Sequence, residues 1–466
     1  MLFSSIPFLY YFLPSVLILY FIVPKKLKNT ALMLSSLVFY GWGEPKYVIL
    51  MIASIIIGYF SGILIEAFSQ KKASKLFLGI AVAVNLGFLA YFKYADFFIE
   101  NFNAVTGLSV SLLRIALPIG ISFYTFQILS YTIDVYRKNV RAQRNIINLA
   151  AYITMFPQLI AGPIVRYSDI EAQLKERTHS FENFSKGARR FIIGLGKKIL
   201  IANSLGELCD IFKASDDKSI LFYWLYAVAF GLHVYFDFSG YSDMAIGLGR
   251  IFGFEFNENF NYPFISKSAT EFWRRWHMSL GTWFRDYVYI PLGGNRTSKP
   301  RWFFNIFVVW FLTGFWHGAA WNFIIWGLFF AIVLIIEKLF LLKYLDKSKV
   351  ISRIYTLVAV GISFVIFNAT DMKEAFSYIG GMFGAGNTPL VSTELFYYLK
   401  SYAVTIIIGI IGATPIVKKT AERLFESSKI SKFIWISEPV GLVVLLAVMT
   451  AFLVDGSFNP FLYFRF

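Results

Sequence analysis

The sequence predicts an all-α, polytopic helical membrane protein with about 11 membrane segments. Of its 466 residues, 57% are hydrophobic and 19% are aromatic. Charged residues make up 15%, whereas soluble proteins carry roughly 25%, and the mean hydropathy is +0.60. A water-soluble core of this size could not bury so much apolar surface, so lipid is the expected solvent.

The basic residues indicate which partners the protein meets. The net charge of +16 is spread over short clusters of lysine and arginine between the apolar runs. Cytoplasmic loops of membrane proteins carry such clusters, so we expect the lipid bilayer and no nucleic acid as a partner. The clusters could also meet anionic headgroups or phosphorylated ligands. The single cysteine, Cys209, excludes an internal disulfide and a multi-cysteine metal site, and we predict no metal site.

The N-terminal half contains the first expected spans. The first apolar run ends before Lys25 and has neither a basic leader nor a small-residue cleavage site. We therefore expect a retained span with the N-terminus outside. Residues 146–212 contain short apolar pieces and the basic stretch ARRFIIGLGKKIL, for which we expect re-entrant or interfacial helices. Further spans are expected at residues 30–43, 46–66, 76–93 and 111–135.

The C-terminal half continues the same pattern. No internal repeat or linker is visible, so we expect one domain over residues 1–466, with residues 455–466 as a short extracytoplasmic tail. The basic loops place both termini outside the cytoplasm. Spans are expected at residues 302–318, 320–340, 353–369, 396–416 and 434–454.

Polar residues gather in GLHVYFDFSGYSDMAIGLGR, residues 231–250. His233 and Asp237 are four residues apart and so share one helix face. Hydrogen bonds between packed helices would explain any one of these residues. Three ionisable groups within eleven residues favour a wet internal cavity instead. Its expected lining includes Asp237, Ser239 and Asp243.

Aromatic residues alternate with arginines in EFWRRWHMSLGTWFRDY, residues 271–287. Tryptophan and tyrosine at the headgroup level of the cytoplasmic interface would account for the aromatic residues. That interpretation explains His277 less well. Three arginines so close to this histidine could bind a phosphorylated ligand. They are Arg274, Arg275 and Arg285.

A histidine also lies in the apolar stretch FLTGFWHGAAWNF, residues 311–323. An ionisable side chain at membrane depth, here His317, is by default a functional-site hypothesis. Gly314 and Gly318 flank it and would let a second helix or a ligand approach the backbone. A hydrogen-bonded core histidine is the alternative. Together with His277 and the aspartates, a base in a buried reaction chamber is favoured. The chamber would also be lined by Trp316 and Asn322.

The stretches WRRWHMSLGTWFRDYVYIPLGGNR, LTGFWHGAAWNFIIWG and YFDFSGYSDMAIGLGRIFGF resemble the membrane-bound O-acyltransferase (MBOAT) superfamily. They are most similar to its bacterial branch, the alginate and peptidoglycan O-acetyltransferases. LPIGISFYTFQILSYTIDVYR and FPQLIAGPI match that branch too, so the resemblance runs from about Leu117 to the C-terminus. It implies helices arranged around a central funnel.

The resemblance also implies roles for the two histidines. His317 matches the superfamily histidine and would act as a general base on an acceptor hydroxyl, or less readily accept the acetyl group itself. His277 matches the second family histidine and would polarise the thioester carbonyl or hold the developing oxyanion. His233 lies where relatives often have another polar residue, and we assign it no catalytic role.

The same resemblance implies the substrates and the location. Acetyl-CoA would be the cytoplasmic donor substrate, with no bound cofactor, and the protein would lie in the bacterial cytoplasmic membrane. An extracytoplasmic SGNH-type partner would complete transfer to a polysaccharide, whose identity stays open. Two alternatives remain at this point. One is D-alanyl or other acyl transfer to teichoic acid, and the other is a lipid or polysaccharide transporter.

The last stretch, DGSFNPFLYFRF, is unusually apolar for a tail that is expected outside the membrane. We expect it to fold back into the funnel mouth or the outer leaflet. It would then be an aromatic interfacial anchor, or Tyr463 would be an acyl acceptor. The ending resembles the C-terminal tyrosine motif of acyl-relay systems in this group, in which the tyrosine hydroxyl takes the acyl group and passes it outward.

Overall fold

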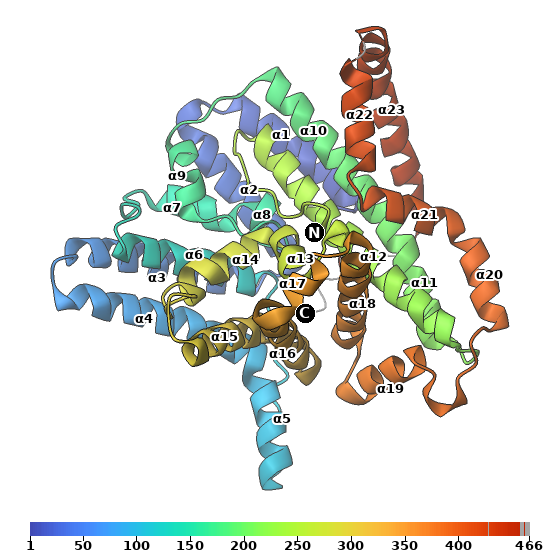
Figure 1. Ribbon diagram of the computed structural model, residues 1–466. Helices are drawn as coiled ribbons and strands as arrows, with labels where there is room; N and C mark the ends of the chain where they lie inside the picture. Colours follow the sequence, from blue (N-terminus) through green and yellow to red (C-terminus); the bar gives the residue numbers. More distant parts are fainter. Residues whose placement is uncertain (427, 457–460, 462–466) are drawn as a thin grey trace. The chain divides into compact units, whose positions relative to one another are not determined.

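The computed structural model describes residues 1–426, 428–456 and 461, and every regular element in this part of the chain is a helix. The all-α prediction is therefore confirmed (Figure 1). The chain divides into two compact units. Unit 1 comprises Met1–Phe191 and Ser242–Asn257, and unit 2 comprises Ile192–Tyr241 and Glu258–Phe466. The expectation of one domain stays a prediction.

Unit 1 contains the first nine helices. Helix α3 packs against α4 and α6, and α2 packs against α7. Glycines on α3 allow the close approach of α6, because a Cβ on Gly62 would lie 2.6 Å from the Tyr131 hydroxyl. The helices are α1 (Leu13–Ile22), α2 (Lys28–Gly43), α3 (Val48–Ala67), α4 (Lys72–Leu89), α5 (Ala95–Thr106), α6 (Ile121–Tyr136), α7 (Ile146–Thr154), α8 (Phe156–Leu159) and α9 (Tyr167–Lys175).

Two longer helices are shared by the units. Helix α10 (Phe181–Gly196) begins in unit 1 and ends in unit 2, whereas α12 (Ile220–Ile251) begins in unit 2 and ends in unit 1. Within unit 2, a Cβ on Gly240 of α12 would lie 2.7 Å from the Gly194 carbonyl oxygen of α10. Glycine at this position therefore lets the two helix backbones touch.

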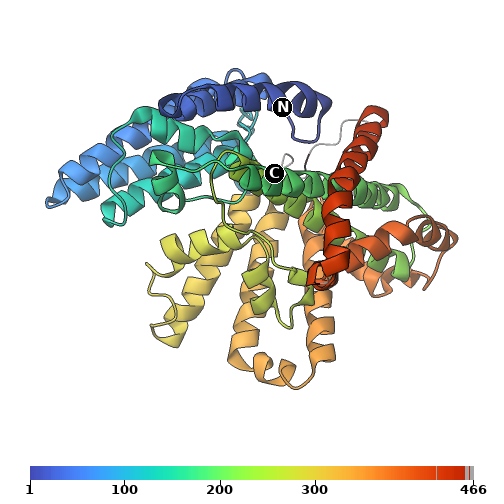
Figure 2. The ribbon, with the colours of Figure 1, turned by 90° about the horizontal axis from the view of Figure 1, so that it is seen from above.

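Unit 2 contains the remaining helices. Its α15 and α16 form a tight hairpin, and α16 also packs against α18, as Figures 1 and 2 show in the yellow to orange part of the ribbon. The helices are α11 (Asn203–Ala214), α13 (Ala269–Arg275), α14 (Met278–Phe284), α15 (Lys299–His317), α16 (Trp321–Ile336), α17 (Leu342–Leu345), α18 (Lys349–Asn368), α19 (Met372–Met382), α20 (Thr393–Ser401), α21 (Ala403–Gly412), α22 (Ile416–Glu426) and α23 (Ser428–Asp455).

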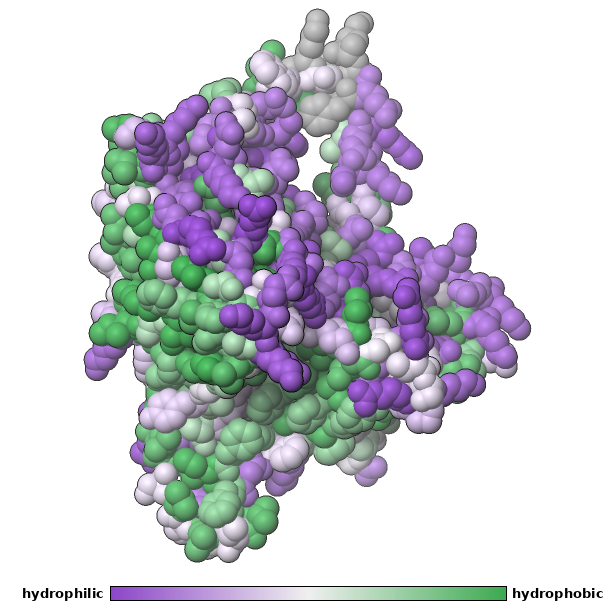
Figure 3. Space-filling view, turned by 90° about the vertical axis from the view of Figure 1, so that its left-hand side faces the viewer, coloured by the Kyte–Doolittle hydropathy of each residue, from purple (hydrophilic) through white to green (hydrophobic). Residues whose placement is uncertain are grey.

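Six helices of the described chain are long and apolar enough to cross a membrane, or seven if a bent pair forms one span. Large apolar side chains are exposed along several of them, and many hydrophobic residues, coloured green, lie on the face shown in Figure 3. The protein is thus a multi-pass membrane protein, while the segment number of about 11 stays a prediction. The six are Val48–Ala67, Lys72–Thr106, Ile220–Ile251, Trp321–Leu345, Lys349–Asn368 and Phe433–Asp455.

Two expected spans differ from the structure. Helix α6 begins at Ile121, so the first part of the span expected at residues 111–135 is not helical. Pro118 lacks the N–H that a helix needs, and Gly120 has φ 76° and lies against the Leu159 carbonyl oxygen. The span expected at residues 396–416 is broken between α20 and α21, where the axis bends by 62°.

Residues 146–212, for which no span could be assigned from sequence, form three short helices followed by a longer continuous helical run. They fold as α7, α8, α9, α10 and α11, with a π-helical turn at Lys197–Ala202. The apolar pieces are short because Pro157 and the turn around Gly162 interrupt them. The expected re-entrant or interfacial placement of these helices stays a prediction.

Candidate active site

His277 occupies a strained backbone position between α13 and α14. Its φ and ψ are 45° and 51°, in the left-handed region, which non-glycine residues seldom adopt. Its side chain is 2% exposed. Such outliers persist only where the surroundings fix them, and they gather at functional sites.

The surroundings of His277 also define its protonation. Its Nδ1 lies 3.2 Å from Asn259 Oδ1, which accepts further hydrogen bonds from the Ser279 backbone N–H and hydroxyl. A backbone N–H can only donate, so this Asn259 atom is the amide oxygen, and His277 Nδ1 must be the protonated nitrogen. Burial lowers the pKa of His277 to about 3. The ring is therefore neutral, with Nε2 as its acceptor atom.

Helix α13, which leads into His277, is held at its start by a buried carboxylate. Glu337, just after α16, accepts hydrogen bonds from the Ala269 N–H at 2.6 Å and the Thr270 N–H at 2.9 Å. These are N–H groups of the first helical turn, which have no partners within the helix. Ser268 caps the same end by accepting from the Glu271 N–H. Glu337 thus positions the segment that carries His277.

His317 is the last residue of α15 and is 6% exposed. The α15–α16 hairpin around it depends on glycine. A Cβ on Gly314 would lie 2.3 Å from the Phe323 carbonyl oxygen, and one on Gly318 would lie 2.3 Å from the Phe323 ring. The expectation that these two glycines admit a second helix is confirmed, and that helix is α16.

Aromatic rings surround His317 and connect it to His277. The Trp316 ring centroid lies 5.0 Å from that of His317 and 6.1 Å from that of His277. Phe238 of α12 lies edge-on to His277 at 4.6 Å. The structure therefore brings the two sequence-predicted histidines to one indole.

A second tryptophan beside His317 offers a buried donor. The Trp326 ring lies 5.0 Å from the His317 ring, nearly perpendicular to it. Its Nε1 is buried and has no hydrogen-bond partner among the residues that the structure describes. A buried N–H without a partner costs free energy, so it is a candidate for binding a ligand oxygen. We expected Asn322 in the lining of the reaction chamber. Its side-chain amide instead donates hydrogen bonds to the Phe367 and Ala369 carbonyl oxygens.

The polar residues of α12 meet a buried lysine. Lys198 Nζ lies 2.5 Å from Asp237 Oδ1, and the two side chains are 0% and 2% exposed. Lys198 lies in the π-helical turn Lys197–Ala202, a kind of irregularity that is frequent at functional sites. His233 on the same face of α12 lies 2.7 Å from the Ala202 carbonyl oxygen, which agrees with a structural role. Ser239 is buried in the same unit.

The remaining expected residues are distributed differently. Asp243 belongs to unit 1, where it pairs with Arg190 at 2.8 Å. Arg275 pairs with Glu271, and Arg285 pairs with Asp286. Arg274 is exposed. Two of the three arginines are thus partly neutralised by carboxylates close in sequence, and their role in donor binding stays a prediction.

Tyr463 lies outside the described residues, but its neighbour Phe461 is described. Phe461 is 1% exposed, with its ring 4.8 Å from the Tyr241 ring and 4.8 Å from Lys198 Nζ. Phe461 therefore lies in the interior of unit 2, beside the Lys198–Asp237 pair.

Sequence reasoning missed Lys198, Asn259 and Glu337. A buried aspartate such as Asp237 requires a cationic partner, and this requirement could have directed attention to the lysines of GLGKKIL. Asn259 gave no such signal, because its role depends on a hydrogen bond to a residue 18 positions away. Glu337 sits at the end of an apolar run, and an ionisable group there could have been noted.

Comparisons with known proteins agree with the motifs. The model of the MBOAT, membrane-bound O-acyltransferase, family matches residues 137–380. The Azotobacter vinelandii protein "Probable alginate O-acetylase AlgI" is 38% identical over 499 residues, covering 100% of both chains. The Helicobacter pylori "Peptidoglycan O-acetyltransferase" is 31% identical, covering 100% of this chain and 98% of that protein. The Bacillus subtilis "Teichoic acid D-alanyltransferase" is 32% identical over 53% of this chain.

Proposed function

The chain belongs to the membrane-bound O-acyltransferase family and is an acyltransferase, and from this premise we propose that it O-acetylates a polysaccharide of the bacterial cell envelope. The relatives that cover the whole chain carry the names of an alginate O-acetylase and a peptidoglycan O-acetyltransferase. The D-alanyltransferase relative covers about half of it. Acetyl transfer is therefore favoured over D-alanyl transfer, and family membership favours an enzyme over a transporter.

The observation that carries the proposal is the placement of two buried histidines against Trp316. In the proposed reaction, acetyl-CoA is the cytoplasmic donor. His317 takes the proton from an acceptor hydroxyl while its oxygen attacks the thioester carbonyl. The new C–O bond forms, the C–S bond breaks, and the CoA thiolate leaves and recovers the proton from His317. Acylation of His317 itself is the less favoured route.

The hydrogen bond to Asn259 supports a role for His277 other than the polarisation of the carbonyl or the binding of the oxyanion that the resemblance implies. Because Nδ1 is the donor to Asn259 Oδ1, a neutral His277 presents a lone pair at Nε2. It would then accept a hydrogen bond at Nε2 from a donor group of a bound substrate rather than donate one to an oxyanion, because the single proton of the acceptor hydroxyl goes to His317. The Trp326 N–H beside His317 is the better candidate for the oxyanion donor, because it is buried without a partner among the described residues.

The acetyl group must then leave the membrane. We propose that Tyr463 takes it as an acyl relay and that an extracytoplasmic SGNH-type partner passes it to the polysaccharide. The burial of Phe461 beside Lys198 supports a tail that reaches into unit 2. A phenol has an ordinary pKa near roughly 10, so phenolate is a better leaving group than a sugar alkoxide. We propose that the protein lies in the cytoplasmic membrane, with both termini outside the cytoplasm.

The donor side of the proposal concerns Arg274, Arg275 and Arg285. Phosphate contacts would be equally strong in the ground state and the transition state, so replacing these arginines should raise KM for acetyl-CoA and leave kcat nearly unchanged. Arg274 should matter most, because Arg275 and Arg285 also pair with carboxylates. Loss of kcat at constant KM would assign the arginines to the reaction centre instead.

The test of the function is acetyl-CoA turnover by the purified protein, followed as release of the free CoA thiol in the presence of an acceptor hydroxyl. We expect turnover with acetyl-CoA and none with a D-alanyl carrier protein. His317→Ala should abolish it while the protein stays folded in the membrane, and His277→Ala should lose most of it. Wild-type turnover by a well-expressed His317→Ala protein would overturn the assignment of the base.

A further inference from the structure

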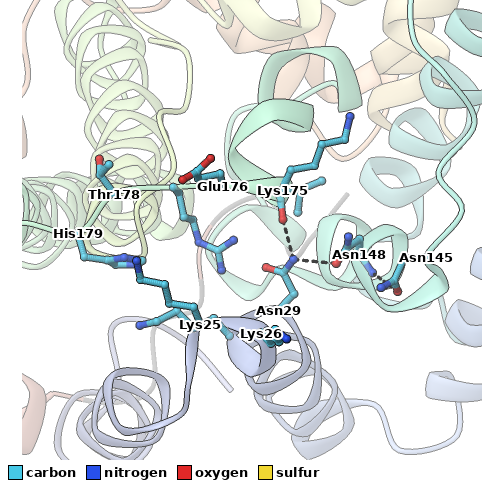
Figure 4. A pocket seen from close by; sticks show the side chains of 12 residues that line it. Lys25, Lys26, Asn29, Asn145, Asn148, Lys175, Glu176, Thr178 and His179 are labelled. Carbon is cyan, nitrogen blue, oxygen red and sulfur yellow. Dashed lines mark hydrogen bonds between the residues drawn. The ribbon is translucent and has the colours of Figure 1, made fainter.

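A basic pocket in unit 1 is not used by the proposed reaction. It has a volume of ≈ 760 Å³ and is formed by the α1–α2 connection, the starts of α2 and α7, and the α9–α10 connection. Figure 4 shows Lys25, Lys175 and His179 around it, with Asn29 hydrogen-bonded to Asn148. Its lining residues are Lys25, Lys26, Lys28, Asn29, Asn145, Asn148, Leu174, Lys175, Glu176, Arg177, Thr178 and His179.

Positive charge in this pocket exceeds negative charge. Lys175 is balanced by Glu171, and Glu176 is the acidic residue of the lining. Within the described chain, no carboxylate lies at ion-pair distance from Lys25, Lys26 or Lys28. Burial lowers the pKa of Lys28, and the charges of Arg177 and Lys25 lower it further. Lysine and arginine side chains in the lining therefore outnumber the carboxylates that could compensate their charge.

The polar groups of the pocket are fixed in place. Arg177 Nε donates to the Tyr20 hydroxyl at 2.9 Å and to the Phe252 carbonyl oxygen at 3.0 Å, and its guanidinium stacks 4.4 Å from the Phe254 ring. Its Nη2 has no hydrogen-bond partner among the described residues. His179 Nε2 lies 2.9 Å from the same tyrosine hydroxyl. A site ordered in advance loses little conformational entropy when a ligand binds.

An exposed apolar stripe leads directly to the pocket. On α1, Ile18, Phe21 and Ile22 are 62%, 42% and 76% exposed, and Lys25 follows within one turn. Apolar side chains so exposed on a membrane protein contact acyl chains, while the lysines at the helix end reach the headgroup level. The stripe and the pocket together match the two parts of a phospholipid.

From this arrangement we propose that the pocket binds the headgroup of an anionic phospholipid, whose acyl chains lie along Ile18 and Ile22. The phosphate would be met by Lys25, Lys26 and the Arg177 cluster, and the amides of Asn29 and Asn148 would border it. Basic pockets beside transmembrane helices bind anionic headgroups in this way. The proposal is independent of the acetyl-transfer chemistry, because no residue of the candidate active site lies in the pocket.

The test uses the full-length purified protein in detergent and measures the apparent affinity for phosphatidylglycerol and for phosphatidylcholine by native mass spectrometry. We expect the wild type to prefer phosphatidylglycerol. The variant K25Q/K26Q should bind it about tenfold or more weakly, since each lysine near the headgroup contributes about 1 kcal/mol. The matched control is K71Q/K72Q, which removes two exposed lysines of unit 1 outside the pocket.

Three outcomes would overturn the proposal. The first is unchanged phosphatidylglycerol affinity in K25Q/K26Q, and the second is an equal loss in K71Q/K72Q. The third is displacement of the bound lipid by adenosine 3′,5′-bisphosphate, which would assign the pocket to a soluble nucleotide phosphate. A preference for phosphatidylglycerol that is lost in K25Q/K26Q alone and withstands the nucleotide supports the lipid site.

Discussion

Lys198 Nζ lies 2.5 Å from Asp237 Oδ1, and the two side chains are 0% and 2% exposed. Taking two charges out of water is costly, and only their mutual attraction and further contacts offset that cost. The pair therefore makes a poor stabiliser compared with apolar side chains of similar volume. The Phe461 ring lies 4.8 Å from Lys198 Nζ, so the pair has an aromatic neighbour from the C-terminal end of the described chain.

Breaking this pair from one side should destabilise the protein strongly. Lys198→Met leaves the Asp237 carboxylate buried without its counter-charge, and we expect a loss of about 3–5 kcal/mol. The double variant K198M/D237L should recover most of that loss. Thermal unfolding of the purified proteins in detergent measures both. If the double variant is as stable as the wild type but inactive, the pair serves function; if it is also fully active, the pair has no role in catalysis.

The protonation of His277 predicts a pH dependence of stability. Its pKa is lowered by burial from the ordinary value of 6.5 to about 3. Between these two values the unfolded chain binds a proton that the folded chain does not, so the stability falls as the pH falls below 6.5. The slope from this group is at most about 1.4 kcal/mol per pH unit. His277→Asn should make the acid limb of a stability–pH profile shallower, and an unchanged limb would contradict the assignment of a neutral ring.

Much of the architecture could be predicted from the sequence because the length of an apolar run can be read from one continuous segment. Helices α3, α18 and α23 match the spans expected at residues 46–66, 353–369 and 434–454. Ends of helices were predicted poorly where a tertiary contact decides them, as at Gly120, whose backbone lies against Leu159.

The candidate site was predictable only in part, for the same reason. The histidines stand out in apolar sequence, whereas the partners that define their chemistry come from distant positions. Lys198 meets Asp237 across 39 residues, and Asn259 meets His277 across 18 residues. No periodicity or motif in one segment encodes such a pair, because it is created when segments that are distant in the sequence pack together.

The glycine at the α15–α16 crossing offers a clean test of the hairpin that carries His317. Gly314→Ala would place a Cβ 2.3 Å from the Phe323 carbonyl oxygen, so the helices must separate, and we expect a loss of stability of roughly 1–3 kcal/mol together with most of the activity. Gly79→Ala on α4 is the control, since nothing lies within 4 Å of its Cβ. That variant should be as stable as the wild type or slightly more so. Equal behaviour of the two variants would contradict the close packing of the hairpin.

The proposed oxyanion donor predicts a kcat effect at Trp326. Trp326→Phe keeps an aromatic ring beside His317 and removes the indole N–H, so we expect kcat to fall by about a hundredfold with KM nearly unchanged. Trp273→Phe is the matched control for Trp326→Phe. The Trp273 Nε1 is also buried without a partner among the described residues, and the centroid of its ring lies 5.6 Å from that of Trp326. That control should keep kcat. A normal kcat in Trp326→Phe would leave the oxyanion to another donor.

The tail predicts where the acetyl group goes after the first transfer. If Tyr463 is the relay, a peptide from the C-terminus of the active protein should carry an acetyl group, and both Tyr463→Phe and His317→Ala should abolish it. Phenylalanine preserves an aromatic anchor, so if the tail is only an anchor, the Tyr463→Phe protein should acetylate the polymer normally.

Phe461→Ala separates the role of the tail as an anchor from its role as an acyl relay. Because Phe461 packs against Tyr241 and Lys198, its loss should weaken the insertion of the tail and lower the acetylation of Tyr463 while the tyrosine itself is intact. Mass spectrometry of the C-terminal peptide, with and without acetyl-CoA, measures each of these outcomes.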